Sequence, residues 1–324
     1  MSAEPSASAL ARFSACLHAL YGSPDGSVGF DWTGARLNEL RALVPFERAW
    51  WGECSSGDAG EAPMNWLHGS IGLAASFAQE WNAIAAADEF AQASMATLGQ
   101  VCRSSGHDSA GAAIEPFSRR HDLFHAMAVT LELPGSGLMF FVSLYRGEAA
   151  LPFQPIEELL LQEYGGHLAR CWHDRLQRRF RDASASGSER LALCEASGEV
   201  LYLGAELARA LRQAVPGWQG AAMPPALLAR FAERPATVRL GRLALELSAC
   251  GELVAVSLAG GARRAELSPR ERAAALLYAQ GHSYKAIAGR LGLSPATVRT
   301  YLRDAYLQLG VRNKVELGAR LSQA

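Results

Sequence analysis

Residues 281–303 read GHSYKAIAGRLGLSPATVRTYLR, and this stretch decides the fold of the C-terminal region. Ser283 and Ser294 each stand where the N-cap of a helix is expected, because a serine hydroxyl can accept a hydrogen bond from an unpaired backbone N–H. Gly292 lies between them, where a first helix would end in a left-handed residue. Pro295 then opens a second helix at a position that needs no backbone N–H. The pattern predicts two helices joined by a tight turn, as in a helix-turn-helix.

The same signals continue on both sides of this stretch and predict four short helices in the last 60 residues. Upstream, Ser268 and Glu271 have the spacing of a capping box, and Gly281 follows where that helix should end. Downstream, Gly310 terminates the third helix and Asn313 caps a fourth. Because these capping residues stand in the order that four helices require, a chance run of serines and glycines is the weaker interpretation.

The third helix of this region has two chemically different faces. Its apolar stripe recurs at the spacing of one helical face and is expected in a small core. The members of the stripe are Val298, Leu302, Ala305 and Leu309. The opposite face suits the edges of bases, because Arg can bond guanine twice and Thr can contact thymine. A solvated face of an ordinary helix is the alternative, and the tight turn before the helix argues against it. The predicted DNA-binding residues, including phosphate contacts from the second helix, are Tyr284, Lys285, Ser294, Ala296, Thr297, Arg299, Thr300 and Arg303.

A set of residues over the last fifth of the chain carries a family resemblance. These residues are Leu267-Ser268-Pro269-Arg270-Glu271, Gly281, Ile287-Ala288, Leu291, Leu293-Ser294, Thr297-Val298 and Leu309-Gly310-Val311-Arg312-Asn313. They resemble the LuxR-type (GerE-type) DNA-binding domain, which implies that the third helix reads the major groove. The resemblance also implies base or phosphate contacts at Thr297, Arg299, Thr300 and Arg303, and a backbone contact at Lys285. Tyr301, Asp304 and Gln308 depart from the usual family pattern, and the last two lower the positive charge near DNA.

The fourth helix is expected to mediate dimerisation, because the resemblance implies a dimer contact there. Helix-turn-helix proteins read paired half-sites through two-fold symmetry, so we expect a homodimer on an imperfect palindrome. Val315, Leu317 and Leu321 are the predicted dimerisation residues, as apolar surface that four helices cannot bury alone. A long helix over residues 153–181 offers further apolar surface, and the sequence does not show which helix dominates.

The distribution of charge also separates the C-terminal helical region from the rest of the chain. Residues 265–324 contain nine Lys and Arg against four Asp and Glu, a net charge of +5. The preceding 264 residues contain 22 and 28, a net charge of −6. A basic end on an acidic remainder is typical of a DNA reader attached to a sensor that does not contact DNA.

Residues 8–182 are predicted to form a first α+β domain. Two apolar runs, 123–133 and 138–146, flank Pro134-Gly135-Ser136-Gly137 and predict a hairpin. The order of elements, an antiparallel sheet between helices, is similar to a GAF-type sensor fold. The other expected elements are helices over 9–21, 35–43, 74–98 and 153–181 and strands over 46–53 and 65–71.

A smaller module is predicted over residues 189–260, after a polar linker at 182–188. Its order of strand, strand, helices, strand and strand looks like a PAS-like fold. The expected strands are 191–194, 200–203, 238–247 and 253–258, with a helix over 205–214 and another from Pro224-Pro225. The predicted fold class is therefore α+β, with GAF-like and PAS-like sensor modules followed by an all-α domain at 264–324.

Five of the seven tryptophans lie in the first 81 residues, and aromatic walls with few polar groups suit a ligand site. Trp50, Trp51 and Trp66 are the candidate pocket residues. The alternative is that these rings belong to the core or to a dimer interface. An acyl-homoserine-lactone receptor is a specific version of the ligand hypothesis, although the chain carries no convincing copy of the pocket signature of those receptors.

No catalytic or metal site is predicted. The chain has no GxxxxGK[ST], GxSxG or HExxH motif, and its lysines are Lys285 and Lys314 alone, which argues against phosphotransfer. His121 and His125 are spaced for a helix but precede a strand, and Glu163, His167 and Cys171 form an ordinary helical face. Six scattered cysteines without a CxxC pair indicate reduced thiols. The start of the chain lacks the features of a signal peptide, and no apolar run is long enough to cross a bilayer.

These observations predict a cytoplasmic, non-enzymatic and cofactor-free transcription regulator whose sensor region controls DNA binding or dimerisation. Its expected partners are double-stranded DNA and a second copy of the chain, with RNA polymerase and a small-molecule ligand as further candidates and no membrane. The alternative function is an adaptor that uses the helix-turn-helix as a docking surface. The sequence does not identify the ligand or the operator, or whether transcription rises or falls.

Overall fold

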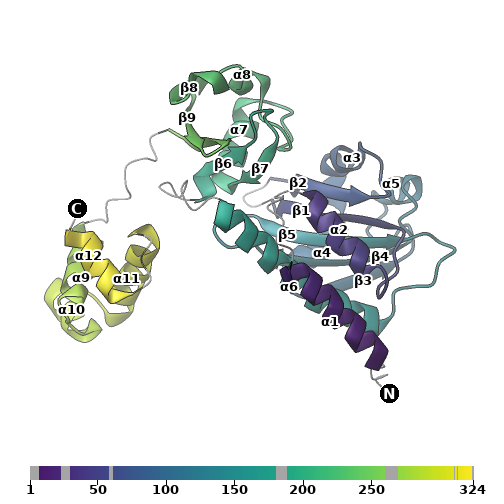
Figure 1. Ribbon diagram of the computed structural model, residues 1–324, viewed down its shortest axis with the longest axis horizontal. Coiled ribbons are helices and arrows are strands. Elements are labelled where there is room, and N and C mark those ends of the chain that lie inside the picture. The colour runs from purple at the N-terminus through teal and green to yellow at the C-terminus, as the bar shows by residue number, and fades with distance from the viewer. Residues whose placement is uncertain are drawn as a thin grey trace. The chain divides into compact units, whose positions relative to one another are not determined.

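The computed structural model describes residues 7–22, 30–57, 61–179, 188–259, 269–309, 311 and 313–322. Figure 1 shows two antiparallel sheets followed by a group of helices at the C-terminus. The chain forms two compact units, one made of residues 1–184 and 188–258 and the other containing residues 259–324. The α+β class expected from the sequence is confirmed.

The first sheet has the strand order β2-β1-β5-β4-β3, and all neighbouring strands are antiparallel. The β4–β5 hairpin pairs Glu132 with Met139, as the turn signal between them predicts. The edge strand β3 escapes prediction, because its sequence VCRSS has too few apolar residues for a strand pattern. The strands are β1 (Arg48–Ser55), β2 (Met64–Ile71), β3 (Val101–Ser105), β4 (His125–Glu132) and β5 (Met139–Arg146).

Helices cover both faces of this sheet (Figure 1). One face packs against α1 (Ala7–Gly22), α2 (Phe30–Leu40) and α6 (Pro155–Arg179) in a core that includes Trp51 and Trp172. The other face packs against α3 (Phe77–Ile84), α4 (Glu89–Ala96) and α5 (Glu115–Arg120) in a separate cluster that includes Trp50 and Trp81. The two faces therefore have independent cores.

The prediction of a single helix over 74–98 is wrong, because the helical backbone is interrupted before Asp88 and restarts after it. Helix α3 ends at Ile84, and a short 3-10 turn over Ala85–Ala87 follows it. Asp88 then has extended backbone, and its side chain accepts a hydrogen bond from the Ala91 backbone N–H. An aspartate side chain that binds nearby backbone stops one helix and caps the next.

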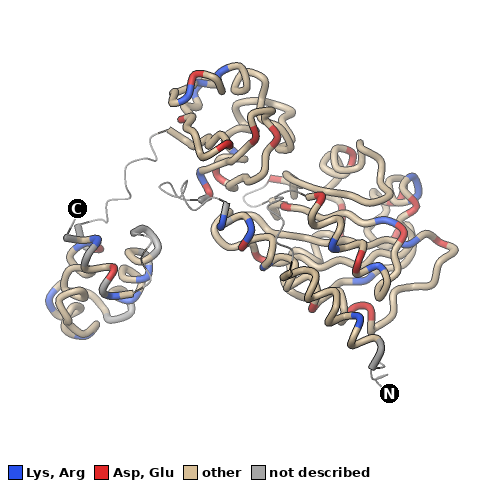
Figure 2. Tube along the Cα trace, in the orientation of Figure 1, with Lys and Arg blue, Asp and Glu red and all other residues tan. Residues whose placement is uncertain are grey.

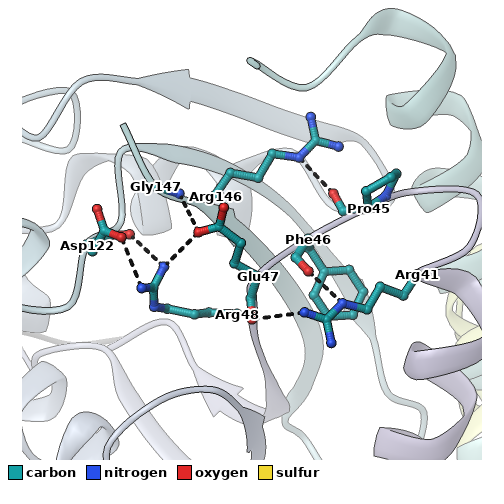
Figure 3. A network of polar contacts seen from close by, with 8 residues as sticks. All are labelled: Arg41, Pro45, Phe46, Glu47, Arg48, Asp122, Arg146 and Gly147. Atoms are coloured by element: carbon teal, nitrogen blue, oxygen red, sulfur yellow. Dashed lines mark hydrogen bonds and ion pairs between the residues drawn. The ribbon is translucent and has the colours of Figure 1, made fainter. Parts of the chain in front are cut away.

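A network of arginines closes one end of the first sheet (Figure 3). Arg48 forms ion pairs with Glu47 at 3.2 Å and with Asp122 at 3.0 Å. Asp122 has a φ of 51°, so these contacts hold a left-handed residue in place. Arg146 pairs with Glu157 of α6 at 2.6 Å, and both side chains are nearly buried. The network fixes the start of α6 against the sheet.

The second sheet has the strand order β7-β6-β10-β9-β8. The strand expected over 238–247 is in fact two strands, because Gly241 adopts a φ of 59° and turns the chain into a tight hairpin. Its strands are β6 (Leu191–Cys194), β7 (Val200–Leu203), β8 (Ala236–Leu240), β9 (Leu243–Cys250) and β10 (Leu253–Leu258), and its helices are α7 (Ala205–Ala214) and α8 (Pro225–Leu228), with 3-10 turns at Ser188–Arg190 and Phe231–Glu233.

The two sheets belong to the same compact unit and share apolar clusters. The Ala205 backbone N–H at the start of α7 donates to the carbonyl of Ser136 in the β4–β5 turn at 2.8 Å. The ring of Trp66 on β2 lies 6.0 Å from that of Trp218. The boundaries 8–182 and 189–260, and the likeness to GAF-type and PAS-type folds, stay predictions.

The second unit consists, in its described residues, of the four expected helices α9 (Pro269–Ala279), α10 (Tyr284–Leu291), α11 (Pro295–Leu309) and α12 (Lys314–Ser322). The capping residue Ser268 and the terminator Gly310 lie outside the described residues. The core of this unit comprises Ala274, Ala275, Ile287, Ala288, Val298, Leu302, Ala305, Leu317 and Leu321. Across the described parts of both units, no helix has the length and apolar character needed to cross a bilayer.

Candidate nucleic-acid interface and sensor cavity

The helix-turn-helix of the second unit is built by the capping residues that the sequence predicts. The Ser283 hydroxyl accepts from the Ala286 N–H at 3.2 Å and starts α10. Gly292 ends α10 in the left-handed region, with φ 65° and ψ 38°. The Ser294 hydroxyl then accepts from the Thr297 N–H at 3.1 Å and starts α11. Local hydrogen bonds thus set the tight turn between α10 and α11.

The two faces of α11 are separated as expected. Val298, Leu302 and Ala305 of the predicted apolar stripe are buried in the domain core, and the side chain of Leu309 lies outside the described residues. The exposed residues on the opposite side are Arg299, Thr300 and Arg303. Two cations and a hydroxyl on one exposed helical face are the groups that base edges and phosphates accept.

The other predicted DNA-binding residues have different surroundings. Ser294 and Thr297 bond each other through their hydroxyls at 2.8 Å, so both side chains serve the cap. The side chain of Ala296 lies outside the described residues. Lys285 is exposed in the first turn of α10. Tyr284 beside it is 38% exposed, and its ring stacks on that of Tyr278.

Two of the three residues predicted for dimerisation on α12 are buried instead of exposed. Leu317 and Leu321 are 0% and 5% exposed, because they pack into the core of their own domain. The expectation that four helices cannot bury these side chains is therefore wrong. The side chain of Val315 lies outside the described residues.

Figure 2 shows Lys and Arg on all four described helices of the second unit. Beyond α11, the basic residues whose side chains are described lie on α9, α10 and α12: Arg272, Lys285, Arg290, Lys314 and Arg320. Arg290 of α10 also contacts the His282 ring nitrogen at 2.9 Å. The positive charge counted in the sequence is thus spread over all four helices.

The first unit contains a cavity of about 50 Å³ between the first sheet and helices α3 and α4. A volume of this size holds a few water molecules and is far below the roughly 300–1,000 Å³ of drug-sized ligand sites. Its walls are mostly aromatic and aliphatic, with a few polar groups. The lining residues are Trp50, Cys54, Trp81, Asp88, Phe90, Ala91, Ser94, Met95, Ala128, Thr130, Phe141, Ser143 and Tyr145.

Of the three predicted pocket tryptophans, only Trp50 lines this cavity. Neighbouring residues of a strand point to opposite faces, so Trp51 lies in the core on the α6 side of the sheet. Trp66 packs against Trp218 of the second sheet's module. The structure therefore does not bring the three tryptophans together in this cavity, and a role of Trp51 or Trp66 in ligand binding stays a prediction.

The cavity has a defined polar end. The carboxylate of Asp88 accepts from the Trp81 indole N–H at 2.8 Å and from the Ala91 N–H at 2.9 Å. Burial raises the pKa of Asp88, and the bonds from Ala91 and Trp81 oppose that effect. The hydroxyls of Ser94 and Thr130 bond each other at 2.8 Å.

The indole N–H of Trp50 is buried and has no hydrogen-bond partner among the described residues, as is also the case for Trp32 and Trp51 in the core on the other face of the sheet. Buried donors of this kind are uncommon, because an unpaired N–H costs free energy. Sequence reasoning missed Asp88, whose signal is a helix-capping residue inside an alanine-rich run.

The histidines considered as metal ligands do not converge. His121 contacts Glu80 through its Nε2 at 3.1 Å, whereas His125 contacts the Ser105 hydroxyl and the Ala150 carbonyl. His167 bonds the Tyr21 hydroxyl at 2.7 Å. In the portion of the chain that is described, no group of three His, Cys, Asp or Glu side chains is arranged to hold a metal ion.

Comparison with known proteins identifies the family of the domain in the second unit. Residues 265–320 match the family of bacterial regulatory proteins named luxR (GerE). The C-terminal unit is a LuxR-family domain. The transcriptional regulatory protein UhpA of Escherichia coli K12 is 46% identical over 68 residues, which are 21% of this chain and 34% of UhpA. UhpA of Salmonella typhimurium is 47% identical over 68 residues. The chain thus spans about a third of the length of these relatives, 34% in each case.

Solved structures are similar to the chain at a lower level. Escherichia coli SdiA matches 97% of this chain and 96% of its own, with 12% identity and a TM-score of 0.40. CepR2 of Burkholderia cenocepacia, an N-acylhomoserine-lactone-dependent LuxR-family transcription factor, matches 54% of this chain and 99% of its own, with 13% identity and a TM-score of 0.39. Both scores lie below 0.5, where a likeness supports no functional inference.

Proposed function

We propose that this protein is a sequence-specific, DNA-binding transcription regulator. The observation that carries the proposal is the exposed face of α11, where Arg299, Thr300 and Arg303 lie opposite a buried stripe and follow a capped, tight turn. This is the arrangement in which a recognition helix enters the major groove with its polar side chains toward the bases. The LuxR-family domain supports the same assignment.

The side chains divide into two roles under this proposal. Arg299 and Arg303 are long, exposed cations that reach base edges or phosphates from the recognition helix. Lys285 lies in the first turn of α10, where backbone N–H groups and a positive side chain attract a phosphate. Ser294 and Thr297 act through the cap that orients α11. Base contacts give specificity, and phosphate contacts give register and salt-dependent affinity.

We further propose that the first unit is a sensor whose cavity binds a small, mostly apolar molecule. Two observations support this second part: the buried indole N–H of Trp50 lacks an acceptor among the described residues, and the Asp88 carboxylate stands in the same cavity wall. A ligand with one carbonyl and one N–H or O–H group would bond both. A lactone signal of the quorum-receptor type is one member of that class, and the cavity of about 50 Å³ would have to open to admit its acyl chain.

The remaining parts of the proposal follow from the DNA-binding role. The protein acts as a homodimer on a palindromic site, without catalysis or cofactor, in the cytoplasm, and it contacts RNA polymerase when it activates a promoter. We propose domain boundaries at 8–182, 189–260 and 264–324. An adaptor that docks proteins through α11 is the competing function.

A selection experiment separates the two functions. The full chain is incubated with a randomised duplex DNA library at several salt concentrations, and the bound fraction is sequenced. A regulator enriches an imperfect palindrome, and its affinity falls with salt in proportion to the phosphates neutralised. Absence of any enriched sequence at low and physiological salt contradicts the proposal and leaves the adaptor role.

The sensor part is tested separately by thermal unfolding with a library of small acyl amides and lactones. A ligand that binds the folded state at a hundredfold excess over its dissociation constant stabilises it by about 3 kcal/mol. The control is Trp50→Phe, which keeps most of the ring volume and removes the indole N–H. Stabilisation of both proteins to the same extent would contradict the role of Trp50.

A further inference from the structure

A continuous series of aromatic and cationic contacts crosses the LuxR-family domain. Lys314 Nζ at the start of α12 lies 5.1 Å from the ring centre of Tyr278 on α9. The rings of Tyr278 and Tyr284 are nearly parallel, at 10°, with centres 5.5 Å apart. The guanidinium carbon of Arg299 on α11 lies 5.9 Å from the ring centre of Tyr284. We call these four residues the tyrosine stack.

Hydrogen bonds fix the middle of the tyrosine stack. A hydrogen bond with Tyr278 raises the pKa of the Tyr284 hydroxyl. Tyr278 also bonds the hydroxyl of Tyr306 on α11, whose pKa is raised chiefly by burial. The two stacked rings are therefore linked by their hydroxyls as well as by their faces, and the ring of Tyr284 lies next to the guanidinium of Arg299.

The cap of α12 fixes the far end of the tyrosine stack. The Asn313 side chain accepts from the Glu316 N–H at 2.9 Å, and its amide donates to the Glu316 carboxylate at 2.6 Å. Lys314 is the first residue of the helix that this cap starts. Leu317 and Leu321 of the same helix are buried in the domain core. Helix α12 thus joins one end of the stack to the domain core, and exposed Arg299 on α11 forms the other end.

The chemistry of guanidinium makes this contact useful for reading bases. A guanidinium group stacks on an aromatic ring through its flat face, while its N–H donors point outward in its own plane. A guanidinium that packs on Tyr284 in this way keeps its donors available for a guanine edge. An unsupported arginine loses much rotamer freedom when it binds, and a side chain held in place before binding loses less.

We propose that Tyr284, supported by Tyr278, is a positioning residue that orients Arg299 for base recognition. Tyr284 then acts through Arg299, instead of as a DNA contact in its own right. The inference rests on the proposed DNA-binding function. It adds that specificity at the base pair read by Arg299 depends on an aromatic ring in another helix.

The test uses the full chain and the duplex that the wild-type protein selects from a randomised library. Dissociation constants are measured for that duplex and for duplexes changed at one base pair at a time. Five proteins are compared with the wild type: Tyr284→Leu, Tyr284→Phe, Tyr284→Trp, Arg299→Ala and the double variant of Tyr284→Leu with Arg299→Ala. Thermal unfolding of each protein checks the fold.

Tyr284→Leu is expected to weaken binding about two- to fivefold, the range of a partly exposed cation–π contact. The loss should occur at the same base pair whose preference disappears in Arg299→Ala, and the other base pairs should keep theirs. In the double variant, the leucine should add no further loss. Tyr284→Phe should restore base preference, because the ring face remains. Tyr284→Trp should do so as well, since indole binds cations best among aromatic rings.

Three results would overturn the inference. A loss in Tyr284→Leu that adds fully to that of Arg299→Ala would make Tyr284 an independent contact. A loss spread evenly over all base pairs would make its role structural, and unchanged binding would leave it without a role. If the wild-type chain selects no sequence, the proposed function fails first, and the inference fails with it.

Discussion

Glu53 on β1 accepts a hydrogen bond from the indole N–H of Trp172 on α6 at 2.8 Å, and it does so in the core of the first unit. The side chain of Glu53 is 0% exposed, and its second carboxylate oxygen has no partner among the described residues. Burial raises the pKa of Glu53 to about 7, although the bond from Trp172 acts in the opposite direction. The pKa of a carboxyl group that joins the sheet to its longest covering helix is therefore raised well above the usual range.

Stability should depend on pH through Glu53. Its folded pKa lies above the ordinary value of 4.5, so the folded state holds the proton more tightly than the unfolded state. The resulting stabilisation is complete below about pH 4.5 and is lost as the pH rises through about 7. Glu53→Gln, which stays neutral, should match the wild type near pH 4.5 and exceed its stability by about 3 kcal/mol at pH 8. Urea unfolding at both pH values measures the difference, and equal stabilities at pH 8 would contradict the burial of a charge there.

The bond between Trp81 and Asp88 predicts a coupling at the cavity wall. Asp88→Asn keeps an oxygen to cap α4 but presents an amide where Trp81 needs an acceptor, which should cost about 1–3 kcal/mol for a buried unpaired donor. In a Trp81→Phe background the same substitution should cost much less, because the donor is gone. A double-mutant cycle by urea unfolding gives the coupling. Equal costs in both backgrounds would show that Asp88 acts only as a helix cap.

Local signals predicted the second unit well and the first unit less well. Ser283, Gly292 and Ser294 act on backbone groups a few residues away, so their sequence positions fix where helices start and end. Pocket membership depends on strand direction instead. Trp50 and Trp51 differ by one residue and lie on opposite faces of β1.

The tyrosine stack is a second feature that local sequence signals do not predict. Tyr278 and Tyr284 lie on different helices, and neither capping rules nor periodicity states that two ring faces will meet. The burial of Leu317 likewise depends on how α12 folds back on α9, a tertiary contact that apolar spacing alone does not give. Contacts between helices determine the ring stacking and the burial of Leu317, whereas the sequence pattern predicts only the helices that carry these residues.

Substitution of Leu321 should affect the fold before it affects assembly. Leu321 is 5% exposed in the domain core, so Leu321→Asp would bury a charge at a cost on the order of 3 kcal/mol or more. We expect the helices of the second unit to melt early, as followed by circular dichroism and limited proteolysis. Leu321→Met, which keeps the volume apolar, is the matched control. An intact second unit in Leu321→Asp would restore the case for α12 as a dimer surface.

With Leu317 and Leu321 buried, the long helix α6 is the better candidate for the homodimer contact. Leu159 is 57% exposed and Ile156 is 37% exposed on this helix. Leu159→Glu should leave the melting temperature almost unchanged, since an exposed site costs little, and it should lower the dimeric fraction. Glu163→Gln, a polar change on the same helix, is the control. Light scattering at matched concentrations measures the mass of the particle. Identical dimer fractions in Leu159→Glu and the wild type would contradict a dimer contact through α6.

Salt dependence should separate the two kinds of DNA contact in the second unit. Lys285→Ala removes a predicted phosphate contact, so binding should weaken on every duplex and the slope of log affinity against log salt should fall by about one unit. Arg303→Ala should instead cost about 1–3 kcal/mol on the selected duplex alone, if Arg303 bonds a base at two positions. Arg320→Ala, which removes an equal charge from the exposed side of α12, controls for net charge and should change neither measurement appreciably. Anisotropy titrations on the selected and a scrambled duplex, from 50 to about 300 mM salt, supply all three comparisons. If Arg303→Ala weakened binding equally on both duplexes and Lys285→Ala weakened it only on the selected duplex, Arg303 would be the phosphate contact and Lys285 the base contact.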